Sequence, residues 1–163
     1  MPETTLTPSR LWKRLSPEQR LRIAKALWLD ENAAGDQLQA VQLISQQKKF
    51  RPKTVNALDD DQKARHLASL GSLPDQLAVA ALIAYHLAEQ RPMMSAFLDA
   101  LGIVHENGLI QDEKVTPDPA KVGPAVAELA RQFPPESVSL YVDTLLCQDP
   151  ETWGVLSGAR ERL

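Results

Sequence analysis

The sequence predicts an all-α protein, folded either as an irregular helical bundle or as a short stack of helical repeats. Apolar residues recur at helical spacing along most of the chain. Capping residues and prolines stand where these segments begin, and glycines stand where several of them end. A faint internal repeat is the third observation. With 163 residues, of which 44% are hydrophobic, the chain can bury a real core, and we expect one helical domain over residues 1–163.

The internal repeat has a period of about 43 residues. Segment 15–27 aligns without gaps on segment 58–70 with four identities, and nearly the same offset recurs twice further along the chain. A period of this length is typical of units of two or three helices. Chance similarity is the alternative, because amphipathic helices share leucines at helical spacing. The possible repeat units are 15–57, 58–100 and 101–145.

Helix starts are marked clearly in the first part of the chain. Ser9 is expected to cap a short first helix. Ser16, a following proline and Gln19 predict a capping box at the start of the second helix. Asp36 and Asp59 are expected to cap the starts of two later helices. Further helices are expected at about 53–58, 59–70, 75–90, 92–101, 120–133, 136–147 and 150–156.

Residues 103–119 depart from the helical pattern. Gly102 is expected to end the preceding helix. Asn107-Gly108 stands between two short apolar runs, which is the strongest short signal for a β-hairpin. The residues that follow are polar and include two prolines, as in an exposed loop. We therefore predict a small hairpin and loop insertion that packs on the helices, because a two-stranded hairpin alone is marginally stable.

Motifs for catalysis and nucleotide binding are absent from the sequence. There is no phosphate-binding glycine loop, His-Glu-x-x-His motif, calcium loop or nucleophile elbow, and we predict no cofactor. The best local candidates for a ligand or metal loop are His105, Glu106 and Asp112, because imidazole and carboxylates bind divalent cations. Their spacing matches no established ligand pattern. The alternative is an exposed turn in which His105 is a surface residue.

Charge is distributed unevenly along the chain, although the net charge is only −3. Residues 1–58 contain ten Lys and Arg against five Asp and Glu, whereas residues 59–163 contain eight against sixteen. Such asymmetry can attract an acidic partner to the first part of the chain. The candidate partner-binding residues are four cations that flank a turn, namely Lys48, Lys49, Arg51 and Lys53.

The cysteine content and the longest apolar run indicate the compartment. Cys147 is the only cysteine, so an intrachain disulfide is excluded, and we expect a buried thiol in a cytoplasmic protein. The nearly apolar run 77–88 is shorter than the roughly 20 residues that span a bilayer, so we expect no membrane association. The charged tail Arg160-Glu161-Arg162 is expected to fray.

These observations favour a non-enzymatic helical module for protein–protein interaction. Two alternatives stay open: an enzyme or metal-binding protein that uses the 103–119 loop, and a nucleic-acid-binding regulator that uses the basic N-terminal third. The second is weaker, because a pI of about 5.6 is low for a DNA-binding domain. In addition, Trp12, Trp28 and Phe50 are expected to pack inside the protein rather than to stack on bases.

Overall fold

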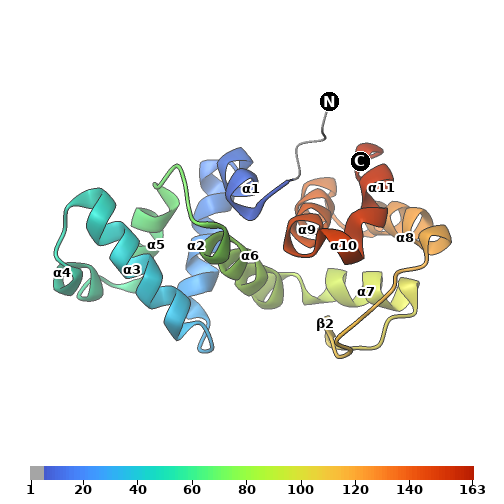
Figure 1. The fold of residues 1–163 in the computed structure, drawn as a ribbon, viewed down its shortest axis with the longest axis horizontal. Coiled ribbons are helices and arrows are strands. Elements are labelled where there is room, and N and C mark those ends of the chain that lie inside the picture. The colour runs from blue at the N-terminus through green and yellow to red at the C-terminus, as the bar shows by residue number, and fades with distance from the viewer. Residues whose placement is uncertain (1–5) are drawn as a thin grey trace. The chain divides into compact units, whose positions relative to one another are not determined.

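The computed structural model describes residues 6–163 and confirms the all-α fold (Figure 1). The helices are α1 (Pro8–Arg14), α2 (Pro17–Leu29), α3 (Ala34–Lys48), α4 (Pro52–Asn56), α5 (Asp60–Ala68), α6 (Asp75–Glu89), α7 (Arg91–Leu101), α8 (Pro119–Gln132), α9 (Pro135–Gln148), α10 (Pro150–Trp153) and α11 (Ser157–Glu161). The strands are β1 (His105–Glu106) and β2 (Leu109–Ile110), and a 3₁₀ turn, η1 (Gly154–Leu156), precedes α11. Within these residues no helix combines the length and the apolar character needed to cross a membrane.

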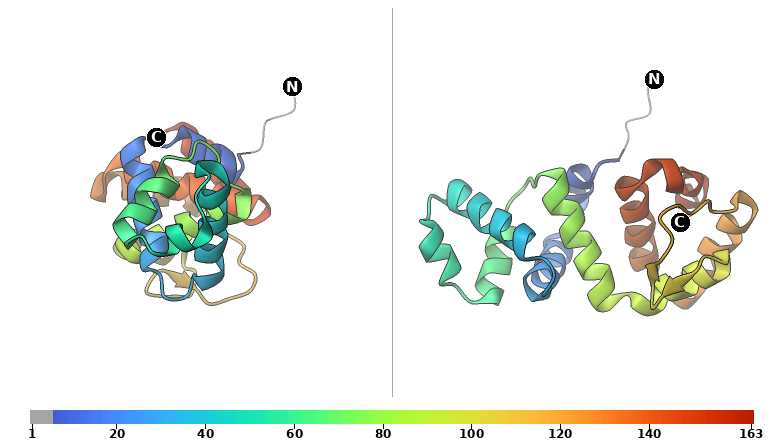
Figure 2. Two further views of the ribbon diagram at one scale, coloured as in Figure 1. Left: turned by 90° about the vertical axis from the view of Figure 1, so that its left-hand side faces the viewer. Right: turned by 60° about the horizontal axis from the view of Figure 1, so that its bottom comes forward.

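Tertiary contacts divide the chain into two compact units, and the boundary between Tyr85 and His86 falls inside α6. Residues 7–85 contain twelve Lys and Arg against eight Asp and Glu, and we name them the basic unit. Residues 86–163 contain six against twelve, and we name them the acidic unit. Figure 2 follows the chain through both units by colour. The single domain and the repeat of about 43 residues stay predictions.

Several predicted helix ends are confirmed. The Gln19 backbone N–H donates to Ser16 Oγ at 3.2 Å, while the Ser16 N–H donates to Gln19 Oε1 at 3.0 Å, which completes the capping box of α2. Asp59 Oδ1 accepts a hydrogen bond from the Gln62 N–H at 2.8 Å and caps α5. Gly102 takes the left-handed conformation, with φ of 70°, and ends α7. These ends are specified by residues close in sequence.

Two other predicted helix starts are wrong. α1 begins after Thr7, whose hydroxyl accepts a backbone hydrogen bond, so Ser9 lies inside the helix. Pro8 favours this earlier start, because its fixed φ suits the first helical position. α3 begins after Ala33, so Asp36 lies in the first turn. There its carboxylate still stabilises the helix through the helix dipole without acting as the cap.

The core of the basic unit forms mainly where α2 packs along α5. Ile23, Leu27 and Leu67 are fully buried in it. Trp12 of α1 is fully buried too, and its indole Nε1 donates a hydrogen bond of 2.9 Å to the backbone oxygen of Leu70. This bond satisfies the polar atom of a large apolar side chain, so Trp12 fills the core without leaving an unpaired donor.

The core of the acidic unit joins α7, α8, α9 and α10. Phe97 meets Tyr141 edge to face, with ring centroids 5.5 Å apart and an interplanar angle of 86°. Trp153 and Leu129 belong to the same buried cluster. Burial raises the pKa of the Tyr141 hydroxyl, because the charged phenolate is poorly solvated there. Cys147 is buried, as predicted.

The predicted hairpin lies in the acidic unit. Strands β1 and β2 are antiparallel, with His105 opposite Ile110. Asn107 and Gly108 have φ values of 50° and 89°, which a type I′ turn requires. A side chain at position 108 would also place its Cβ 3.0 Å from Met94 Cβ of α7, so glycine lets the turn pack closely on the helix.

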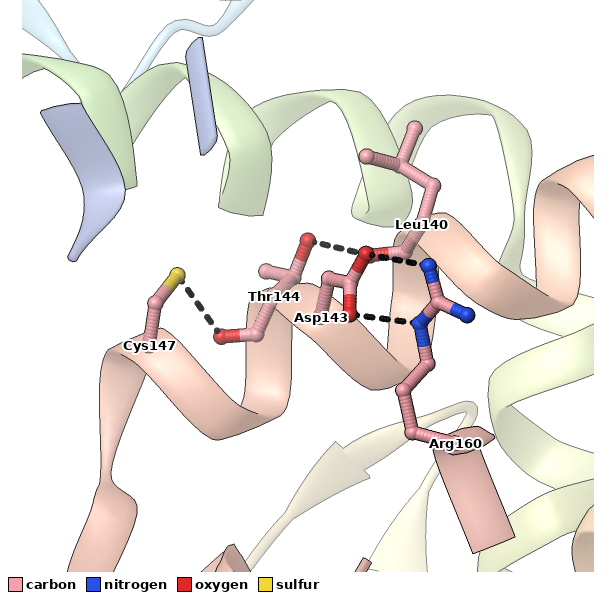
Figure 3. Close-up of polar contacts among 5 residues, drawn as sticks. All are labelled: Leu140, Asp143, Thr144, Cys147 and Arg160. Carbon is pink, nitrogen blue, oxygen red and sulfur yellow. Dashed lines mark hydrogen bonds and ion pairs between the residues drawn. The ribbon is translucent and has the colours of Figure 1, made fainter. Parts of the chain in front are cut away.

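A charged pair secures the last helix of the acidic unit (Figure 3). Asp143 on α9 is 8% exposed, and Arg160 on α11 donates to both its oxygens, from Nε at 2.7 Å and from Nη2 at 3.2 Å. Beside it, the Thr144 hydroxyl donates to the Leu140 backbone oxygen at 2.7 Å, and the Cys147 thiol donates to the Thr144 backbone oxygen at 3.4 Å. The expectation of a frayed tail is therefore wrong at Arg160, because the fork holds α11 against α9.

Candidate functional site

The four candidate cations lie together at the turn between α3 and α4, which we name the basic turn (residues 48–53). Figures 1 and 2 show α4 as a short helix between the end of α3 and the start of α5. Lys48 is half-buried, whereas Lys49, Arg51 and Lys53 are exposed. None of the four forms an ion pair with a carboxylate of residues 6–163. Their charges are therefore available to a group outside this part of the chain.

Phe50 stands in the middle of the basic turn and is 39% exposed. Lys49 takes the left-handed conformation, with φ of 59°, and ends α3. The Phe50 N–H donates to the Ser45 backbone oxygen at 3.1 Å, and the Ser45 hydroxyl donates to the Phe50 backbone oxygen. The ring packs edge to face with the His66 ring, with centroids 5.4 Å apart. The expectation that Phe50 packs inside is wrong, because Phe50 follows the helix end in a turn that leaves its side chain 39% exposed.

The basic unit also contains a pocket of about 260 Å³. Residues of α2, α3, α4 and α5 line it, including Trp28, Leu38, Asn56 and Lys63. The Lys63 Nζ lies 5.4 Å from the centroid of the Trp28 ring, within the range of a cation–π interaction. Leu38 is 57% exposed, although it lines the pocket. An aromatic wall, an exposed leucine, a cation and the carboxylate of Asp60 thus meet in one concave place.

Gln37 fixes the wall of this pocket. Its Nε2 donates to the backbone oxygens of Leu27 and Asp30, each at 2.9 Å. Both oxygens lie at the C-terminal end of α2, where carbonyl groups have no partner within the helix. The side chain therefore ties α3 to the end of α2. Trp28 lies between Leu27 and Asp30 in the sequence, so these bonds hold the backbone segment that carries it.

Trp28 differs from Trp12 in one respect. Both side chains are buried, at 8% and 0% exposure. The Trp12 indole N–H has an acceptor in Leu70, whereas the buried Trp28 Nε1 has no hydrogen-bond partner among the described residues. A buried donor without an acceptor costs about 1–3 kcal/mol. The Trp28 residue also lines the pocket, so we take this pocket as a candidate site.

The structure gives His105 a local role in the hairpin. Its side chain is 11% exposed, so the alternative of a surface histidine is wrong. The Gly108 N–H donates to Nδ1 at 3.0 Å, so the proton of the neutral ring is assigned to Nε2, which lies 2.7 Å from Asp99 Oδ1. Glu106 and Asp112 are exposed. Across residues 6–163 no three His, Cys, Asp or Glu side chains are grouped to hold a metal ion.

The pocket was not predicted from the sequence. Trp28, Gln37 and Lys63 are far apart along the chain, and no spacing rule connects them. The cations of the basic turn, in contrast, lie close together in the sequence, so the sequence alone identifies the cluster. Comparison of this chain with protein-family models, with curated proteins and with solved structures gives no match, so the proposal of function rests on these two sites.

Proposed function

We propose that the protein is a non-enzymatic helical interaction module whose basic turn binds an acidic segment of a partner protein. The observation that carries this proposal is the group of four cations without acidic partners in residues 6–163, placed around the partly exposed Phe50. Unpaired cations attract a negatively charged chain and speed its association. An aromatic side chain among them adds apolar contact, as in the centre of many interfaces.

The geometry of the turn supports binding without large rearrangement. Lys49 is fixed in the left-handed conformation, and two hydrogen bonds join Ser45 to Phe50. A turn that already has its bound shape loses less conformational entropy when a partner binds. The basic turn therefore offers its charges at a defined spacing.

An acidic protein segment suits this surface better than a nucleic acid. The chain places three carboxylates, Asp59, Asp60 and Asp61, at and just after the start of α5, close behind α4. Asp61 is paired with Lys25 and Arg65, but Asp59 and Asp60 repel a phosphate backbone that extends beyond the turn, whereas a short acidic peptide can end before them. Four cations also give few phosphate contacts compared with typical DNA-binding proteins.

The test measures binding of a synthetic peptide, Glu-Glu-Ser-Leu-Ser-Glu-Glu, by amide chemical shifts in a nitrogen-15 spectrum. We expect the amides of residues 48–53 to move, and the affinity to fall at higher salt because the contacts are exposed. The variant Lys48→Glu/Lys49→Glu/Arg51→Glu should bind at least about tenfold more weakly. Its free energy of unfolding should fall by no more than about 1 kcal/mol, because Lys49 and Arg51 are exposed and only Lys48, in the last turn of α3, meets the helix dipole.

The matched control is Lys13→Glu/Arg14→Glu/Arg22→Glu, which makes the same charge change at exposed positions of α1 and α2. This control should bind the peptide within about twofold of the wild type. Equal loss in both variants would reduce the effect to net charge and contradict the proposal. Tighter binding of a short DNA duplex than of the peptide, at the same salt, would favour the nucleic-acid alternative instead.

A further inference from the structure

We infer that the acidic segment bound by the basic turn is the hairpin of a second copy of this chain. This inference rests on the proposed function and names its partner. We call residues 104–113, which contain β1, β2 and their flanking residues, the acidic hairpin. Its three carboxylates are exposed and form no ion pair with residues 6–163, namely Glu106, Asp112 and Glu113. These charges are opposite in sign to those of the basic turn, so the two surfaces attract each other between molecules.

The acidic hairpin also presents apolar side chains beside its carboxylates. Glu106 and Leu109 lie opposite each other on its outer face, where Leu109 is 49% exposed. The ladder extends one step further, because the Gln111 N–H donates to the Val104 backbone oxygen at 3.4 Å. Since side chains alternate along a strand, Val104 shares the face of Glu106, and it is 65% exposed. One face of the hairpin therefore combines negative charge with exposed apolar surface.

The basic turn has the complementary arrangement. Phe50 is 39% exposed among the cations, and its backbone is fixed by the two hydrogen bonds with Ser45. Contact of Phe50 with Val104 and Leu109 removes apolar surface of both molecules from water. The cations around Phe50 then meet the carboxylates at the edge of the contact, where charges contribute specificity. The two surfaces match in charge as well as in apolar character.

The length of the acidic hairpin agrees with the position of Asp59 and Asp60. These two carboxylates follow α4 and repel an acidic chain that extends past the basic turn. The hairpin reverses its direction at the tight turn between β1 and β2, and Lys114 ends its acidic run. It therefore offers its carboxylates to the cations without a further acidic stretch that would meet the start of α5.

The contact joins different surfaces of the two molecules, so it is heterologous. Each molecule uses its basic turn for one neighbour and its acidic hairpin for another, which links copies head to tail. Both surfaces are small, so we expect the association to be weak and transient. It should be strongest at low salt, because the charges are exposed.

The experiment uses two variants, each of which lacks one half of the contact. The turn variant is Lys49→Gln/Arg51→Gln/Lys53→Gln, and the hairpin variant is Glu106→Gln/Asp112→Asn/Glu113→Gln, all at exposed positions. Neutral replacements are used because reversed charges would attract each other when the variants are mixed. At low salt the average mass of the wild type, measured by sedimentation equilibrium, should rise with protein concentration above that of the 18.0 kDa monomer. It should return to the monomer at high salt.

The two variants should complement each other. Each alone should associate at least about tenfold more weakly than the wild type. An equimolar mixture should associate again and stop at a dimer, because one variant supplies only a hairpin and the other only a turn. When the hairpin variant alone carries nitrogen-15, addition of the turn variant should shift its amides in residues 48–53. With the labels exchanged, the amides of residues 104–113 should shift.

The matched control is Glu89→Gln/Glu151→Gln/Glu161→Gln, which neutralises three exposed carboxylates elsewhere in the acidic unit. It should associate within about twofold of the wild type, because these charges lie outside the hairpin. Equal loss in the control and in the hairpin variant would reduce the effect to net charge and overturn the inference.

The remaining outcomes separate this inference from the proposed function. A wild type that stays monomeric at low salt, while the peptide Glu-Glu-Ser-Leu-Ser-Glu-Glu shifts the amides of residues 48–53, would overturn the inference and leave the proposed function intact. Self-association of the wild type without association in the mixture would assign the contact to other surfaces, which also overturns it. If the basic turn binds neither the peptide nor the hairpin, the proposed function fails as well.

Discussion

The two units of the molecule treat their polar groups differently. In the acidic unit, Asp143 and Arg160 form a fork, and both ring nitrogens of His105 have partners. In the basic unit, the cations of the basic turn have no acidic partner within residues 6–163. The buried Trp28 indole N–H has no acceptor in the same range. The basic unit has internal pairs too, such as Trp12 with Leu70 and Lys25 with Asp61, but the cations of the basic turn are left for other molecules.

This difference separates the residues that hold the structure from those that we propose for binding. Replacing a polar group that is paired inside the fold lowers the stability of the protein, because its partner is left without a hydrogen bond. A cation without a partner can be changed at little cost to folding, and its loss is felt only in binding. Substitutions of internally paired groups should therefore lower stability, whereas substitutions in the basic turn should lower binding.

The largest effect is expected for Asp143→Ala in the acidic unit. The change removes two hydrogen bonds to Arg160 and leaves the guanidinium beside a mostly buried site. We expect the free energy of unfolding to fall by about 2–3 kcal/mol, measured by urea denaturation. Glu161→Ala, at an exposed position of α11, should change it by less than about 0.5 kcal/mol. An Asp143→Ala variant as stable as the wild type would break the comparison between the units.

A smaller effect should distinguish the two tryptophans of the basic unit. Trp12 and Trp28 are both buried beside a cation, Arg20 and Lys63 respectively, so replacement by Phe removes a similar side chain. Of these two changes, Trp12→Phe alone breaks a hydrogen bond. The Trp12 indole N–H donates to the Leu70 oxygen, whereas the Trp28 indole N–H has no acceptor among the described residues. Trp12→Phe should destabilise the protein by about 1–2 kcal/mol more than Trp28→Phe, measured by thermal unfolding. Equal losses would show that the Trp28 N–H is satisfied in solution.

The smallest effect concerns Tyr141 and alkaline pH. Burial raises the pKa of its hydroxyl above the ordinary value of 10.0, so the folded state keeps the proton where the unfolded chain releases it. This contribution to stability is intact below pH 10 and is lost as the pH rises above it. At pH 10.5 the wild type should lose about 0.8 kcal/mol relative to Tyr141→Phe. Denaturation curves at pH 8 and pH 10.5 give this difference, and parallel losses in the two proteins would contradict a dry environment for Tyr141.

The features that could be predicted from the sequence are those set by neighbouring residues. Ser16 with Gln19, Asp59 and Gly102 act on backbone groups within a few positions, so their pattern alone predicted the helix ends. Asn107-Gly108 predicted the hairpin for the same reason. The start of α1 was missed because Thr7 and Ser9 are equally good caps, and the proline between them decided the outcome.

The features that could not be predicted depend on residues far apart in the sequence. Arg160 pairs with Asp143, which lies seventeen residues away on another helix. The sequence alone therefore indicated a frayed, charged tail. The Trp28 pocket requires α2, α3 and α5 to be in place, and Trp28 on its own is typical of a core residue. The basic turn could be predicted from the sequence because its charges are close together along the chain. The exposure of Phe50 could not be predicted in this way.

The geometry of the hairpin also affects how the protein ages chemically. An asparagine followed by glycine loses its side-chain amide when the glycine nitrogen attacks the asparagine side-chain carbonyl and forms a cyclic imide. Here the Gly108 N–H is bonded to His105 Nδ1, and the Asn107 backbone oxygen is bonded to Arg91 Nη1 at 2.8 Å. These bonds hold the backbone in the turn and oppose the rotation that cyclisation needs. The folded hairpin therefore protects Asn107 from deamidation, which would add another negative charge to a unit that already has twice as many acidic as basic residues.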